Sequence, residues 1–67
     1  MSTSPHEELE LLLDKMGLPL LLASLADIAN EKAEHVATNW QDQNLAKRWR
    51  KAGTALGTFS RRMASIF

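Results

Sequence analysis

The spacing of apolar and polar residues along the chain predicts three helices and no strand. The last of them is the most regular, because large apolar residues and one alanine recur at alternating intervals of four and three, which is the spacing of one helix face. These positions are Leu45, Trp49, Ala52, Leu56, Phe59, Met63 and Ile66. We expect this apolar seam to pack against another helix, with Leu56 and Phe59 buried at its centre.

Residues 5–16 are framed by signals for the start and the end of a helix. Ser4 suits the N-cap, Pro5 the first helical position, and Gly17 the residue after the last turn. Four large apolar residues share one face of this helix by their spacing: Leu9, Leu12, Leu13 and Met16. We therefore expect a short, amphipathic N-terminal helix.

A second helix is expected over residues 19–39, with an apolar face wide enough to touch more than one neighbour. Its seam runs through Leu18, Leu22, Leu25, Ala29, Lys32, Val36 and Asn39, flanked by Leu21 and Ile28 on one side and by Ala26, Ala33 and Trp40 on the other. Lys32 interrupts this seam. It either extends its ammonium group to water or meets an acid across an interface and fixes the register.

The segment 39–42 predicts a tight turn in which Asp42 caps a third helix over residues 43–66. Because the connection is short, the two long helices should be antiparallel neighbours. The expected fold is all-α, a single domain over residues 1–67 built as a helical hairpin or a three-helix bundle. A chain of 67 residues without cysteine has a marginal core and no disulfide. Its two long apolar faces therefore predict a symmetric homodimer.

Small residues form a second stripe beside the seam of the third helix. Gly53 and Gly57 make a GxxxG pair there, although each glycine costs about 1 kcal/mol in a helix relative to alanine. We expect both to permit the close approach of a helix, whereas a kink is the alternative. The full set of predicted helix-packing residues is Trp49, Gly53, Leu56, Gly57, Phe59 and Met63. Alanines at positions 26, 29, 33 and 37 are the candidate partner surface, in the same chain or in a second copy.

Charge is divided along the chain although the formal net charge is zero. Residues 1–34 carry seven acidic and two basic residues, and residues 35–67 carry six basic residues and one acidic residue. The candidate partner-binding residues are basic and lie off the seam of the third helix: Arg48, Arg50, Lys51, Arg61 and Arg62. They suit an acidic protein or the acidic half of another copy. A merely solvated face, a nucleic acid and an anionic membrane are the alternatives. No nucleic-acid-binding motif in the sequence supports the nucleic acid.

No catalytic motif is found in the sequence, which lacks a nucleophile elbow, a phosphate-binding loop and a Cys–His pair. We therefore expect no enzymatic activity and no cofactor. Glu31 and His35 share a helix face, but the Glu-x-x-His pattern of di-iron bundles is missing. An ion pair is expected there, and no metal site.

The most apolar stretch, residues 18–29, is too short to span a bilayer. The polar N-terminus lacks the pattern of a secretion signal, so we expect a cytoplasmic protein. The sequence as a whole predicts a small interaction module, acting as an adaptor, inhibitor or assembly factor, that self-associates and binds a protein partner through its helical faces.

Overall fold

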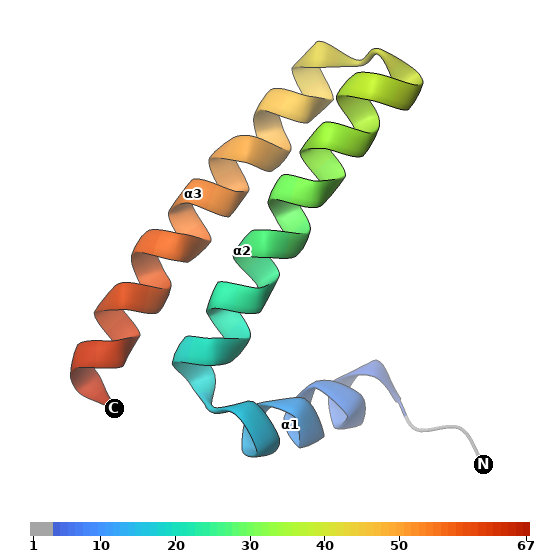
Figure 1. Ribbon diagram of the computed structural model, residues 1–67. Coiled ribbons are helices and arrows are strands. Elements are labelled where there is room, and N and C mark those ends of the chain that lie inside the picture. Colours follow the sequence, from blue (N-terminus) through green and yellow to red (C-terminus); the bar gives the residue numbers. More distant parts are fainter. Residues whose placement is uncertain (1–3) are drawn as a thin grey trace.

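A computed structural model describes residues 4–67, which contain three α-helices and no strand (Figure 1). Helix α1 spans Pro5–Met16, α2 spans Leu18–His35 and α3 spans Gln43–Ile66, and a π-helical turn, η1, spans Val36–Trp40. The long helices α2 and α3 lie side by side and antiparallel, and α1 leaves the open end of this hairpin at an angle (Figure 1). Within residues 4–67, α1 contacts α2 but not α3. The fold is therefore a hairpin with an attached helix and not a closed three-helix bundle.

Side-chain hydrogen bonds cap the starts of α1 and α3 at the residues that the sequence predicted. The Ser4 hydroxyl accepts the backbone N–H of Glu7 at 3.2 Å, and the Asp42 carboxylate accepts the backbone N–H of Leu45 at 3.0 Å. Gly17 ends α1 with a φ of +83°, a conformation that side chains disfavour. These caps determine where α1 and α3 begin and where the chain turns from α1 into α2.

The link between α2 and α3 differs from the predicted tight turn over residues 39–42. The helix continues from Val36 to Trp40 as a π turn, and Gln41 then adopts the left-handed conformation with a φ of 54°. Only Gln41 and Asp42 therefore lie between the helical segments. The spacing of apolar residues does not distinguish a π turn from an α turn, and for this reason the sequence did not predict it.

Small residues form the core between α2 and α3. The buried residues on the α2 side are Leu22, Ala26, Ala29, Ala33 and Val36, and those on α3 are Ala46, Gly53 and Ser60. The three on α3 are seven residues apart and so form one line along the helix. At the open end of the hairpin, the Ser60 hydroxyl donates a hydrogen bond of 2.7 Å to the Pro19 carbonyl. The alanines of the second helix thus meet the small-residue stripe of the third within one chain.

The apolar seam of α3 does not form this core, contrary to our expectation. Phe59 and Ile66 of the seam are exposed, and the other five seam residues are half-buried. The expected burial of Leu56 and Phe59 is therefore wrong for the single chain, in which Phe59 is 46% exposed. The residues of α3 that face α2 each directly follow a seam residue in the sequence: Ala46, Gly53 and Ser60. Their small side chains let the two backbones approach more closely than leucines would.

Gly53 lies at a close contact between the two long helices, whereas Gly57 does not. A Cβ atom added to Gly53 would lie 2.5 Å from Asn30 Oδ1 and 3.2 Å from the carbonyl oxygen of Ala26. The same atom on Gly57 would meet only Nη1 of Arg61, at 4.0 Å. The helix-packing role predicted for Gly57 is therefore not found within the chain.

Substitution of the two glycines tests this difference. Gly57→Ala should raise the free energy of unfolding by about 0.5–1 kcal/mol, because alanine favours the helix and has room here. The matched control Gly53→Ala should lose this gain, since its methyl group would displace the Asn30 side chain and press on the Ala26 carbonyl. Urea denaturation measures both values, and equal stabilisation by the two substitutions would contradict close packing at Gly53.

Candidate functional site

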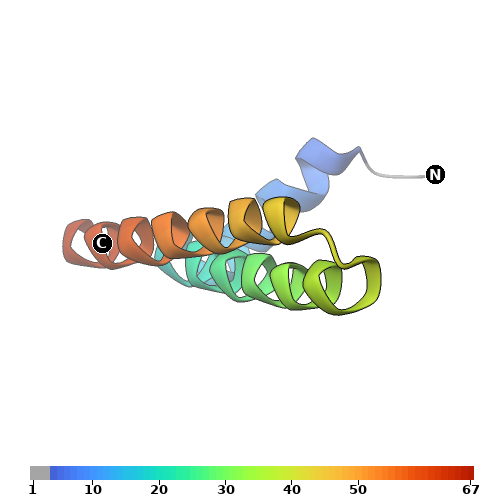
Figure 2. The same ribbon diagram turned by 90° about the horizontal axis from the view of Figure 1, so that it is seen from above.

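The chain forms a single layer of helices. Its Cα atoms extend over 37 × 37 × 12 Å with a radius of gyration of 14.0 Å, against about 11 Å for a compact domain of this length. Seen from above, α1 projects away from the hairpin (Figure 2). Domains usually bury their apolar residues between at least two packed layers. Within the described part of the chain, this hairpin has no second layer to cover it, so both of its broad sides are left open.

One broad side of the hairpin, which we call the apolar face, carries large apolar side chains. Its residues are Leu18, Leu21, Leu25, Ile28 and Lys32 of α2, spaced alternately by three and four, and Trp49, Leu56, Phe59 and Met63 of α3. The two lines meet on the same side, because Nζ of Lys32 lies 5.7 Å from the ring centroid of Trp49. Leu25, Ile28 and Phe59 are 37%, 45% and 46% exposed. A continuous set of large apolar side chains therefore contacts water.

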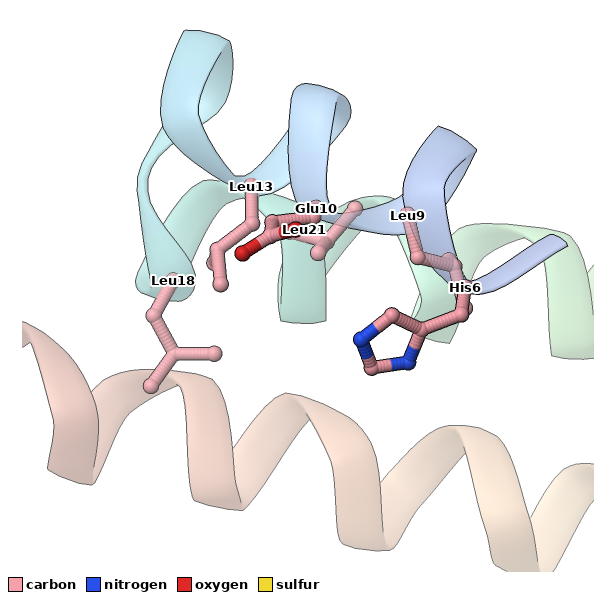
Figure 3. A pocket seen from close by; sticks show the side chains of 6 residues that line it. All are labelled: His6, Leu9, Glu10, Leu13, Leu18 and Leu21. Carbon is pink, nitrogen blue, oxygen red and sulfur yellow. The ribbon is translucent and has the colours of Figure 1, made fainter. Parts of the chain in front are cut away.

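A cavity of about 390 Å³ lies at the elbow between α1 and α2, at one end of the apolar face (Figure 3). It is lined by His6, Leu9, Glu10, Leu13, Leu18 and Leu21. The Leu18 side chain points from α2 toward α3, and His6 and Leu9 lie at the other end of the hollow (Figure 3). Since α1, Pro5–Met16, contains no buried residue, its apolar side is unpartnered beyond this elbow.

A second cavity, of about 380 Å³, lies at the tip of the hairpin and at the other end of the apolar face. It is lined by Lys32, His35, Val36, Trp40, Leu45 and Trp49, and so contains both tryptophans of the chain. The π turn η1 carries Trp40 to this position, where it is 66% exposed. Single π turns are frequent at functional sites.

Contacts at the tip orient the side chains of this cavity. The ring of His35 meets the edge of the Trp40 ring, with centroids 6.2 Å apart and an interplanar angle of 67°. Nδ1 of His35, for which the sequence suggested Glu31 as partner, lies 2.8 Å from Nδ2 of Asn39. The sequence pointed to Lys32 through its place in an apolar line. The sequence did not reveal the cavity, because Trp40 precedes the turn and Trp49 follows it. Only the folded hairpin brings the two side chains together.

The five predicted partner-binding residues are all exposed, and the structure divides them between two sides of α3. By helical spacing, one group lies on the side away from α2: Arg48, Lys51 and Arg62. The other group, Arg50 and Arg61, lies on the flank opposite the apolar face, where Nη2 of Arg61 donates to Oγ1 of Thr58 at 3.3 Å. The predicted basic face is thus two separate lines.

Acidic residues of α2 share the flank of Arg50 and Arg61. Asp27 and Glu34 are seven residues apart and lie on the side of α2 away from the apolar face. That side of the hairpin therefore carries both signs of charge. The first group, which we call the basic line (Arg48, Lys51 and Arg62), keeps a single sign.

Within residues 4–67 no group of three or more His, Asp and Glu side chains is placed to hold a metal ion. In the same part of the chain, no helix combines the length and the apolarity needed to cross a membrane. No protein-family model, curated protein or solved structure matches the chain.

The cap at Asp42 positions the start of α3, and with it Leu45 and Trp49 in the tip cavity. Asp42→Ala should lower the free energy of unfolding by about 1 kcal/mol, because the Leu45 N–H loses its acceptor. The control Asp27→Ala removes an exposed carboxylate from the middle of α2 and should change this value by less than about 0.5 kcal/mol. Urea denaturation that gives equal losses for the two variants would rule out the cap.

Proposed function

We propose that the chain is a non-enzymatic protein-interaction module that forms a homodimer through its apolar face. The observation that carries this proposal is the single layer of helices, which exposes 5381 Å². That area is about 1,100 Å² more than a compact monomer of this mass exposes. A standard protein interface buries roughly 800 Å² on each partner. The excess is therefore sufficient for one such interface.

The composition of the apolar face also supports this proposal. Leucine, isoleucine and aromatic side chains are grouped there, with Lys32 as the charged residue among them. The cores of interfaces are enriched in aromatic residues and depleted of charge, and large exposed apolar patches mark sites of association. A second copy is the simplest occupant, because one face can pack on its own image around a two-fold axis.

Sedimentation equilibrium at micromolar protein should give about twice the monomer mass of 7.5 kDa. Ile28→Ser and Phe59→Ser should each shift the equilibrium toward the monomer, since a hydroxyl group would replace a large apolar group in the interface. The control Thr58→Ser alters an exposed residue beside Phe59 and should leave the mass unchanged. A wild-type chain that stays monomeric at the highest soluble concentration would exclude this function.

We further propose that the basic line binds an acidic protein partner. Support comes from two features: α3 contains no acidic residue, and this line points away from α2. Its charge is therefore not neutralised by close neighbours on its own helix, as the Glu–Lys pairs of ordinary surface helices are. A dimer formed through the apolar face would leave Lys51 and Arg62 accessible.

Lys51→Glu combined with Arg62→Glu tests the basic line. Both side chains are exposed, so the melting temperature and the dimer mass should stay those of the wild type. Proteins captured by chemical cross-linking in cells that express the chain should be lost from the variant. The neutral control Thr54→Ser should retain them. A reversed variant that keeps every captured protein would show that the basic line is only solvated.

A further inference from the structure

We propose that, in the dimer, α1 of each copy covers the tip cavity of the other, with Glu10 of α1 paired to the partner's Lys32. This inference rests on the proposed homodimer and adds which ends of the two chains meet. It also assigns an occupant to the cavity that contains Trp40 and Trp49.

The two cavities lie at opposite ends of the apolar face. Leu18 lines the elbow cavity and Lys32 lines the tip cavity, and their separation of fourteen positions corresponds to about 21 Å of helix. The elbow and the tip accordingly lie at opposite ends of the hairpin (Figure 1). A second copy packed face to face has two symmetric orientations. In the parallel one equal ends meet, and in the antiparallel one each elbow meets the partner's tip.

Charge favours the antiparallel orientation. Glu10 is the carboxylate among the six residues that line the elbow, and Lys32 is the ammonium group among the six that line the tip, with one histidine in each set, His6 and His35. A parallel dimer would bring each Lys32 toward the partner's Lys32, and like charges in an interface cost several kcal/mol. An antiparallel dimer brings each Lys32 toward the partner's Glu10.

Helix α1 has the surface that the tip cavity would bind. Two of its leucines line the elbow cavity beside Glu10 and are open to water, with Leu9 53% and Leu13 37% exposed, and within residues 4–67 α1 does not contact α3. At the tip, Trp40 is 66% exposed. Leucine side chains of α1 placed on the tryptophan rings would remove apolar groups at both ends of the apolar face from water.

Lys32 is already placed for this contact. Its Nζ atom lies over the Trp49 ring at 5.7 Å, so the side chain lies along the cavity and does not extend straight into solvent. A single polar residue in an apolar seam can fix the register and the orientation of a helical dimer. The pair with the partner's Glu10 would give Lys32 that role.

A charge swap tests the pairing in the full chain. Lys32→Glu and Glu10→Lys should each weaken the dimer at least tenfold in Kd, because each creates like charges at both symmetric contacts. The double variant, and an equimolar mixture of the two single variants, should return Kd to within about threefold of the wild type. Dissociation should also shift the tryptophan emission to longer wavelength, because both tryptophans line the tip cavity.

Lys15→Glu and Glu34→Lys are matched controls, since they reverse exposed charges on the same two helices outside both cavities. They should not change Kd by more than about threefold. Circular dichroism melts of all variants establish that they are folded. A wild-type dimer that is insensitive to the single reversals, or one that the double variant does not restore, overturns the proposed pairing and leaves the homodimer standing. A monomeric wild type overturns both.

Cysteine cross-linking provides an independent measurement, because the chain has no cysteine of its own. With a short bismaleimide, a mixture of Glu10→Cys and Lys32→Cys chains should give covalent dimers that join position 10 to position 32. Each variant alone should give few. Efficient cross-linking of Glu10→Cys to itself would show a parallel dimer and overturn the proposal. Efficient cross-linking between positions 10 and 32 supports it even if the charge reversals destabilise the fold.

Discussion

The close approach of α2 and α3 is the constraint from which the other features of this structure follow. At Gly53 the helices are so near that an added methyl group would collide with the Asn30 side chain and press on the carbonyl of Ala26. On the α3 side of this contact the buried residues are an alanine, a glycine and a serine, and none is a leucine. The large apolar side chains of α3 must therefore lie beside the contact. Together with Leu25 and Ile28 of α2 they form the apolar face.

A core of alanines also limits how much the hairpin can stabilise itself. The gain from burial is about 25 cal/mol for each Å² of apolar surface, and alanine offers far less of it than leucine. Ala26, Ala29, Ala33 and Ala46 are among the least exposed residues, whereas the leucines of α1 stay open to water. In the proposed dimer, these open side chains would supply the burial that the single chain lacks. Folding and association would then be coupled, as in many small homodimers.

The sequence predicted the local features of the fold better than its packing. Ser4, Gly17 and Asp42 identified the ends of helices because capping depends on residues close in sequence. The residues of α3 predicted to be buried lie beside the residues that are buried in the structure. Hydrophobicity predicts burial of Leu56 and Phe59, whereas the short distance between α2 and α3 leaves room only for small residues such as Gly53. The π turn was missed because it arises from the geometry of the hairpin tip.

The same distinction applies to the candidate site. The exposure of Arg48, Lys51 and Arg62 was predictable from their place off the apolar seam, since helical spacing alone determines it. Helical spacing also separates them from Arg50 and Arg61, but which of the two groups faces away from α2 became visible only when the direction of α2 was known. The tip cavity required tertiary structure in full, because its lining comes from the end of α2, from η1 and from the start of α3.

Lys32 shows how these surfaces could be kept specific. A leucine at this position would extend the apolar face and add burial, but an entirely apolar face slides easily and accepts several registers and both orientations. A charge within the face makes most of these arrangements unfavourable, because it must meet an opposite charge once water is excluded. The elbow of a second copy offers one in Glu10. In the proposed dimer, Lys32 would lower the strength of association and in return select a single antiparallel arrangement of the two copies, which would leave Lys51 and Arg62 of the basic line free for another protein.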